Sequence, residues 1–240
     1  MAWGRIHIST VTAKGMILMS LFNQGEKAYL MLADGQVFEG RSFGAKGTVI
    51  GEVVFTTGLT GYQETLTDPS YYGQIVTQTF PLIGNYGVNS QDSESAKSYV
   101  SGYIVREWCN APSNFRCEGN INDFLTEHNI IGIHNIDTRR LTRIIREVGV
   151  MNGVITTEDV YAKKDELLEK IRAFEVKNAV KSVTNTETLT YSDEEKECFA
   201  LRPMTCPFQS LVDKLVQGLA ENVRLPYLGR VVVKSVKQVH

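Results

Sequence analysis

A strong excess of charge of either sign is absent from this sequence. Its 240 residues hold 25 lysines and arginines against 27 aspartates and glutamates, which leaves a formal net charge of -2. Proteins that recognise nucleic acid or an anionic membrane surface usually carry a clear excess of basic residues. We therefore expect neither nucleic acid nor a membrane surface among the partners of this chain.

Cysteine is scarce, and its spacing matches no common metal or redox motif. The four cysteines, Cys109, Cys117, Cys198 and Cys206, stand too far apart for a Cys-x-x-Cys pair. A chain of this length can bury enough apolar surface to fold without disulfides. These observations predict free thiols and a cytoplasmic location.

Long apolar runs and the usual short catalytic motifs are also missing. The run MILMSLF at 16–22 is far too short to span a bilayer, and it lacks the small-x-small cleavage site of a secretory signal. We interpret residues 1–26 as an extension. The stretch TGLTGYQETLTDPSYYGQIV at 57–76 is rich in glycine, threonine and tyrosine, yet it holds no phosphate-binding glycine loop, no His-Glu-x-x-His and no nucleophile-elbow serine. These motifs therefore assign no reaction to the chain.

From Lys27 onward the sequence contains a series of short runs of β-branched and aromatic residues. KAYLMLA and QVFEGRSF flank Asp34-Gly35, a pair that readily adopts the positive φ angles of a hairpin turn. Further strands, bounded by Gly, Pro, Asn or Asp, are predicted at 52–57, 74–80, 98–107, 130–133 and 153–158. Together these strands predict a mainly antiparallel sheet.

Helices are predicted at 121–128, 138–148 and 163–174. Asn120 and Asp137 precede the first two and are suitable N-caps, while Gly149 ends the second. The overall prediction is an α/β fold, in which these helices pack against the sheet in one domain at 27–180. Residues 181–240 are predicted to form a linker and an irregular carboxy-terminal tail, because their short apolar segments do not suffice for a second core.

Four arginines lie on the predicted helix at 138–148, away from its apolar stripe. They are Arg139, Arg140, Arg143 and Arg146. One interpretation is the solvated surface of a good helix former. The other is a docking face for an acidic partner surface.

Candidate general bases are few, and the two histidines inside the domain have structural interpretations. His128 ends a predicted helix, where an imidazole usually interacts with terminal carbonyls. His134 follows a buried strand, and we interpret it as structural too. Asp92 and Glu94 are interpreted as solvated loop charges rather than an acid–base pair. We predict no catalytic residue among these side chains.

Several long blocks resemble the amino-terminal domain of the small subunit of glutamine-dependent carbamoyl phosphate synthetase. The blocks are LADGQVFEGRSFGAKG, GEVVFTTGLTGYQETLTDPSYYGQIVTQTFPLIGNYGVN, SNFR and IDTRRLTRIIREVGVMNGVI. They occur in the family's order and near its spacing, over about residues 27–192. VTNTETLTY at 183–191 resembles the connection to that family's second domain.

The resemblance implies a function. In that family the small subunit hydrolyses glutamine and delivers ammonia to a large subunit, which uses ATP and bicarbonate to make carbamoyl phosphate for arginine and pyrimidine synthesis. The amino-terminal domain mainly contacts the large subunit, and an amidotransferase domain carries a Cys-His-Glu triad. The resemblance thus implies a large-subunit partner, with ATP and metal on that subunit and no cofactor in this chain.

Ser70 is the one site residue that the resemblance carries over. The family's loop matching T-D-P-S-Y supplies a serine to the glutamine site, and by motif that serine is Ser70. A hydroxyl can donate to a substrate carboxylate, while Pro69 limits the freedom of the loop. The alternative is a serine that ends an Asp-Pro-Ser turn by bonding its own backbone.

Beyond residue 192 the resemblance stops. We find no G-x-C-L-G-x-Q block and no matching His/Glu pair, and the contexts of Cys198 and Cys206 do not resemble the nucleophile turn. The expectation is a small subunit that carries the docking domain without the glutaminase triad, and that binds glutamine only with an amidotransferase domain. The alternative is a stand-alone binding or scaffold domain with no role in the synthetase.

Overall fold

The computed structural model of the chain describes residues 25–184, 189–193, 196–201 and 231–232. Side-chain environments are described for 25–184. Most of the proposed extension at 1–26, and most of the predicted tail beyond residue 201, therefore lie outside the described residues.

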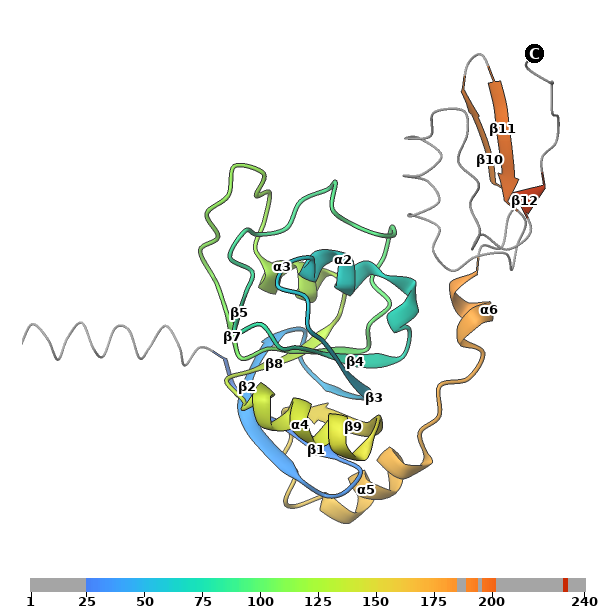
Figure 1. Ribbon diagram of the computed structural model, residues 1–240. Helices are drawn as coiled ribbons and strands as arrows, with labels where there is room; N and C mark the ends of the chain where they lie inside the picture. Colours follow the sequence, from blue (N-terminus) through green and yellow to red (C-terminus); the bar gives the residue numbers. More distant parts are fainter. Residues whose placement is uncertain (1–24, 185–188, 194–195, 202–230, 233–240) are drawn as a thin grey trace, which may run out of the picture.

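The centre of the fold is a closed barrel of seven strands. Their order around the barrel is β1 (Lys27–Leu32), β2 (Val37–Gly44), β8 (Ile131–His134), β6 (Gly102–Ile104), β4 (Gln74–Gln78), β3 (Thr48–Thr56) and β9 (Met151–Thr156). Every predicted strand region contributes to this barrel. In Figure 1 the barrel lies between two groups of helices.

The barrel is more mixed than the mainly antiparallel sheet that we predicted. The β1·β2, β2·β8, β3·β9 and β1·β9 pairs are antiparallel, whereas the β3·β4, β4·β6 and β6·β8 pairs are parallel. Parallel neighbours need long crossover connections, and the chain supplies them between β3 and β8. Strand patterns in the sequence carry no information on pairing direction, so the prediction missed both the parallel pairs and the closure.

The crossover from β3 to β4 contains the threonine- and tyrosine-rich stretch. It forms a short helix, α2 (Tyr62–Thr67), followed by one 3-10 turn, η1 (Pro69–Tyr71). We had not predicted α2. The second crossover includes the short strand β5 (Leu82–Ile83), which pairs in parallel with β7 (Glu107–Trp108).

Turn and cap chemistry follows the sequence predictions closely. Gly35 takes φ 87° in the β1–β2 hairpin, and its N–H donates to the Leu32 carbonyl at 2.9 Å. The Asn120 Oδ1 accepts the Asp123 amide, and the Asp137 Oδ1 accepts the Arg140 amide, each at 2.9 Å. Both predicted N-caps are confirmed.

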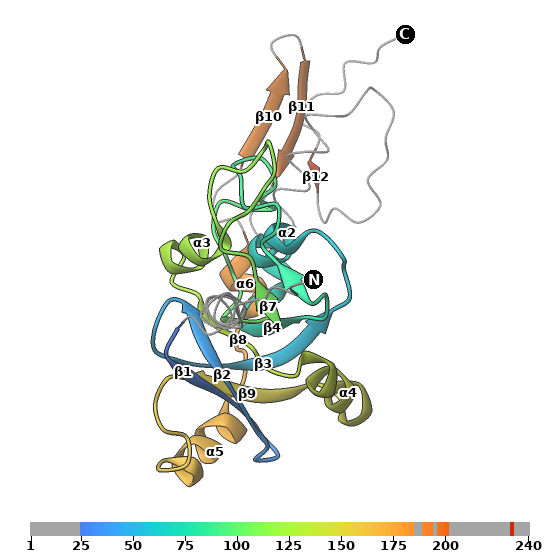
Figure 2. The same cartoon turned by 90° about the vertical axis from the view of Figure 1, so that its left-hand side faces the viewer.

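The three predicted helices are present, and a fourth follows them. They are α3 (Ile121–Glu127), α4 (Thr138–Val148), α5 (Lys164–Ala173) and α6 (Ala179–Val183). Leu141 and Ile145 of α4 join the barrel core with Ile75 and Ile104, which are fully buried. Gly149 ends α4 with φ 98°, as expected. Figures 1 and 2 both show α2 and α3 on the opposite side of the barrel from α4 and α5.

The region predicted as linker and irregular tail contains regular strands. β10 (Leu189–Asp193) and β11 (Lys196–Leu201) pair antiparallel, and β12 (Val231–Val232) pairs with β11. The expectation of an irregular tail is therefore wrong for these strands. Thr190, Tyr191 and Phe199 have β propensity, which the polar composition had outweighed in our prediction.

Removal of the Asp137 cap should weaken α4. Asp137→Ala deletes the acceptor of the Arg140 amide, and loss of such a cap costs about 0.5–2 kcal/mol. We expect this fall in the free energy of unfolding in urea, measured by circular dichroism. Asp137→Asn keeps an acceptor oxygen and is the matched control, with a smaller loss. Equal losses in the two variants would contradict the capping role.

Candidate functional site

Ser70 lies in η1 at the carboxyl end of the β3–β4 crossover, and its side chain is exposed. The backbone N–H of Ser70 donates to the Asp68 Oδ1 at 2.8 Å. The Ser70 hydroxyl makes no hydrogen bond to any residue that the structure describes. Asp68, rather than the Ser70 hydroxyl, therefore closes this turn, and the hydroxyl faces outward with its donor capacity unused.

Pro69 restricts the backbone of the same turn. It is buried, and it occupies the first position of η1, where its fixed φ suits a helical turn and its missing N–H costs nothing. The Tyr71 and Tyr72 amides each bond back to the turn, to the Asp68 and Pro69 carbonyls, at 3.2 Å. Ser70 is thus presented on a backbone that is constrained on both sides.

The amino-terminal end of α2 is capped by a side chain from the next crossover. Gly61 is the N-cap and has no side chain to offer, but the Tyr86 hydroxyl accepts the Gly61 amide at 2.8 Å and the Tyr62 amide at 3.3 Å. The Tyr62 and Tyr86 rings stack with centroids 4.2 Å apart, and the Tyr62 hydroxyl donates to the Gly87 carbonyl. These contacts hold the start of α2 against the loop that follows β5.

Further along α2, hydrogen bonds attach the helix to the same crossover. The Gln63 side chain donates to the Asn89 carbonyl and accepts the Asn89 amide at 2.9 Å. The Thr67 Oγ1 accepts the Glu94 amide at 2.8 Å, and the Ser98 hydroxyl donates to the Leu66 carbonyl. Because α2 leads directly into η1, this network fixes the position of Ser70. Such support from surrounding side chains is what a preorganised binding group requires.

Burial disfavours ionisation of the tyrosines around α2. Burial raises the pKa of Tyr62 and of Tyr86 above its ordinary value, and raises that of the fully buried Tyr103 well above it. Each hydroxyl therefore stays neutral at physiological pH. The Tyr62 hydroxyl therefore remains a donor to the Gly87 carbonyl at physiological pH.

The two histidines inside the domain, His128 and His134, both contact aromatic rings. His134 is only 4% exposed, and its ring meets Phe43 edge-on with centroids 5.6 Å apart. The His128 ring lies 4.3 Å from the ring of Phe124, so it packs on an aromatic face rather than on helix carbonyls. Cys109 and Cys117 are free thiols, as expected. The side chains of Cys198 and Cys206 lie outside the described residues.

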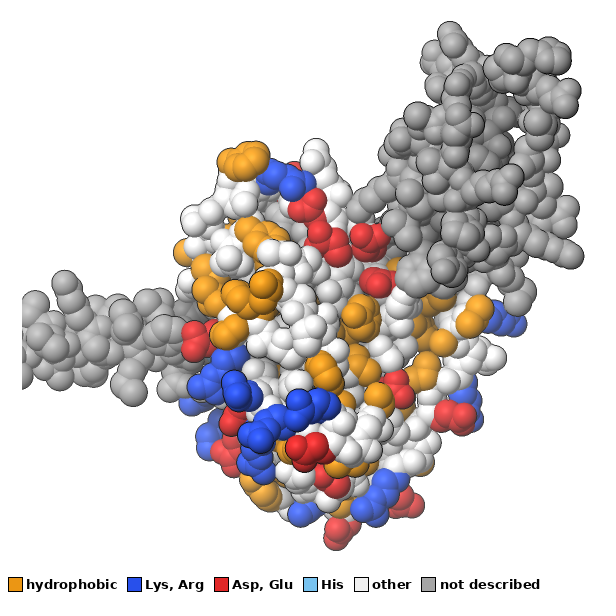
Figure 3. All heavy atoms as spheres, in the orientation of Figure 1, with side chains coloured by type: hydrophobic (Ala, Val, Ile, Leu, Met, Phe, Trp, Pro, Cys, Tyr) orange, Lys and Arg blue, Asp and Glu red, His pale blue; other side chains and the backbone are white. Residues whose placement is uncertain are grey.

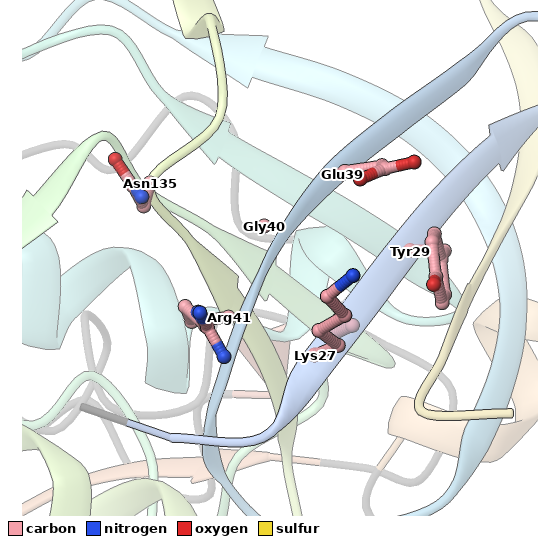
Figure 4. Close-up of a pocket in the computed structure, with 7 residues that line it drawn as sticks. Lys27, Tyr29, Glu39, Gly40, Arg41 and Asn135 are labelled. Atoms are coloured by element: carbon pink, nitrogen blue, oxygen red, sulfur yellow. The ribbon is translucent and has the colours of Figure 1, made fainter. Parts of the chain in front are cut away.

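A shallow hollow of about 180 Å³ lies elsewhere, on the outer face of β1 and β2. In Figure 4, Lys27 and Tyr29 extend from one strand, Glu39 and Arg41 from the next, and Asn135 follows β8. Charges of both signs line the hollow, and Ser70 is not among its residues. The described part of the chain contains no group of three or more His, Cys, Asp or Glu side chains placed to hold a metal ion. Nor does that part contain a helix both long and apolar enough to cross a membrane.

Comparison with known proteins assigns the family. The family model of the carbamoyl-phosphate synthase small chain, CPSase domain, matches residues 30–155, just over half of the chain. The chain belongs to the carbamoyl-phosphate synthase small chain family. The matched residues include nearly all of the barrel, together with α2, η1 and Ser70.

Relatives in that family are similar over most of this chain. The carbamoyl phosphate synthase small chain of Clostridium perfringens (strain 13 / Type A) is 49% identical over 71% of this chain and 48% of its own length. That of Thermosynechococcus vestitus (strain NIES-2133 / IAM M-273 / BP-1) is 50% identical over 74% of this chain and 47% of its own. This small-chain family member therefore spans about half the length of the relatives that it matches.

A solved aminopeptidase from Aneurinibacillus sp. strain AM-1 overlaps 55% of this chain and 31% of its own, with a TM-score of 0.33 and 15% identity. That likeness is too weak to indicate a shared fold or function. The family assignment rests on the sequence matches alone.

The stability of the small-chain domain should fall as the pH rises above about 10, the ordinary pKa of tyrosine. Above that pH the unfolded chain loses phenolic protons that the folded chain retains on Tyr62, Tyr86 and Tyr103, so unfolding is favoured. Urea unfolding at neutral pH and at about pH 11 measures the fall.

Tyr62→Phe tests the source of this dependence. The variant should be less stable than wild type at neutral pH, because the Gly87 carbonyl loses its donor, yet it should lose less stability between neutral and alkaline pH. Parallel profiles for the two proteins would contradict the assignment to buried tyrosine.

Proposed function

We propose that this chain acts as the small chain of a cytoplasmic carbamoyl phosphate synthase. Its barrel domain contacts the large synthase chain, and together with an amidotransferase domain it forms the site where glutamine is hydrolysed to ammonia. The family membership and the names of the relatives support this role. The observation that carries it is the exposed Ser70 hydroxyl, held on a constrained turn inside the matched residues.

The chemistry of Ser70 suits substrate binding rather than bond breaking. An unused hydroxyl can donate to the carboxylate of glutamine. It has no basic side chain bonded to it among the described residues, so nothing there activates it as a nucleophile. The role that we assign to Ser70 is therefore to hold glutamine in place for a nucleophile of the amidotransferase domain.

One hydroxyl contact is too weak to bind glutamine by itself. A neutral hydrogen bond contributes about 0.5–1.5 kcal/mol net, whereas even millimolar affinity requires about 4 kcal/mol. The remaining walls of the site must come from the amidotransferase domain. ATP and its metal ion belong, in this proposal, to the large chain, and this chain needs no cofactor of its own.

Binding to the large chain separates this proposal from its rival. The 240-residue chain should elute together with the large synthase chain in size-exclusion chromatography at micromolar concentrations. The rival, a stand-alone binding or scaffold domain, predicts separate elution. A complex that is absent at every tested concentration up to about 50 µM, roughly fifty times a micromolar dissociation constant, would refute the synthase role.

Glutamine turnover tests whether this chain supplies only part of the glutamine site. The chain alone should not hydrolyse glutamine, and addition of an amidotransferase domain from a relative should restore hydrolysis. In that mixture Ser70→Ala should raise the KM for glutamine more than it lowers kcat, because the contact serves binding.

Ser182→Ala removes another exposed serine hydroxyl, on α6, and is the matched control with unchanged kinetics. A Ser70→Ala variant with normal KM and strongly reduced kcat would contradict the binding role. Glutamine hydrolysis by the chain alone, lost on Cys198→Ser or Cys206→Ser, would show a nucleophile in this chain instead.

A further inference from the structure

The outer face of α4 carries a stripe of arginine side chains. Arg139, Arg143 and Arg146 follow one another at i, i+4 and i+7, a spacing that places all three on one side of a helix. Each is exposed, whereas Leu141 and Ile145 on the opposite side are buried in the barrel core. We call these three arginines the basic face of α4.

No carboxylate neutralises the basic face within the described part of the chain. Ion pairs do form elsewhere: Lys46–Glu26, Arg116–Asp92, Lys163–Glu158 and Lys170–Glu166. The basic face makes none, and no hydrogen bond of its guanidinium groups to a described residue occurs either. Even Glu147 on the same helix forms no ion pair with Arg143. With respect to the described residues, the positive charge of this face is therefore available to a partner.

The neighbouring Arg140, by contrast, has a structural role within the domain. Its guanidinium lies 5.1 Å from the centroid of the Phe38 ring and donates to the Gln36 Oε1 at 3.1 Å. Arg140 thus joins α4 to the β1–β2 hairpin. The basic face makes no such contact, and Arg139 lies in the first helical turn, where the helix dipole disfavours a cation. Helix stability therefore accounts for the charge of Arg146, in the last helical turn, but not for that of Arg139.

The charge is local rather than general. Figure 3 shows lysine and arginine side chains gathered over α4 and the adjoining part of the β1–β2 pair, with a few acidic side chains between them. Arg106 adds to them, because its side chain donates to the Ile136 carbonyl just before α4 begins. The whole chain nevertheless has a net charge of -2, which does not favour a polyanion such as nucleic acid. Local positive charge on a nearly neutral protein is complementary to an acidic protein surface.

Exposed apolar groups stand at the end of the same helix. Val148 is 70% exposed and Val150 is 57% exposed. An apolar contact beside a rim of charges is the usual composition of a protein–protein interface. A small ion would gain no binding energy from contact with the two valines.

We propose that the basic face of α4 docks onto an acidic surface of the large synthase chain. This inference rests on the proposed function and specifies where the two chains meet. The arginines steer the encounter and set its orientation, so the affinity should depend strongly on salt.

Charge reversal tests this surface. The full chain with Arg139→Glu, Arg143→Glu and Arg146→Glu should bind the large chain at least about tenfold more weakly than wild type at low salt, measured by isothermal titration calorimetry. Added salt should weaken the wild-type complex steeply and the variant complex little. A second variant with glutamine at the same three positions should show an intermediate loss, and circular dichroism should show native folding of both.

A matched control changes the same number of charges elsewhere. Lys164, Lys177 and Lys181 are exposed and form no ion pair with a described residue, so reversal of these three to glutamate gives the same net charge. This control should bind the large chain within about threefold of wild type, because screening limits the reach of distant charges.

The outcomes separate the inference from the function on which it rests. Failure of the wild-type chain to bind the large chain would refute the proposed function. Wild-type binding that the α4 reversal leaves unchanged, or that the control reversal weakens equally, would overturn the docking surface and leave the function standing. Binding of wild type, but not of the α4 variant, to a short DNA duplex at physiological salt would also overturn it, since the face would then serve nucleic acid.

Discussion

The pairing of β9 with both β1 and β3 is the constraint on which the rest of this structure depends. Leu30 of β1 and Ile50 of β3 both lie opposite residues of β9, so one late strand joins two early ones and closes the barrel. The Thr48 and Thr156 hydroxyls add a bond at 2.6 Å across the seam. Closure gives every barrel strand two neighbours and leaves no open edge. A barrel without edges is a stiff support for whatever its crossovers carry.

Two crossovers use that support in different ways. The β3–β4 crossover holds Ser70 on a turn. Tyr86 of the following crossover caps α2, and Gln63 of α2 bonds to that same crossover, so together they fix the position of the turn. The connection after β8 instead packs α4 on the far side of the barrel, with its arginines outward. In the proposed synthase, glutamine binding and large-chain docking would therefore use two different connections of one barrel.

Local chemistry explains which elements could be predicted. α4 was predicted to the residue because Asp137, the Leu141 stripe and Gly149 supply its cap, its buried side and its stop within one segment. α2 escaped prediction because its N-cap is Gly61 and the capping hydroxyl belongs to Tyr86, far away in the sequence. The same holds for the candidate site. The T-D-P-S-Y motif pointed to Ser70, but nothing local pointed to the tyrosine and glutamine that support it.

The sequence by itself determined the strands, the caps and the family, since each depends on residues near one another or on long blocks in a characteristic order. Only the tertiary structure decided the parallel pairs, the barrel closure and the state of the Ser70 hydroxyl. Pairing direction depends on which distant segments meet, and a free hydroxyl depends on Asp68 taking the backbone bond that serine could have made. The basic face of α4 needed both: helical spacing aligned its arginines, but only the packed chain showed that no carboxylate within the described residues comes near them.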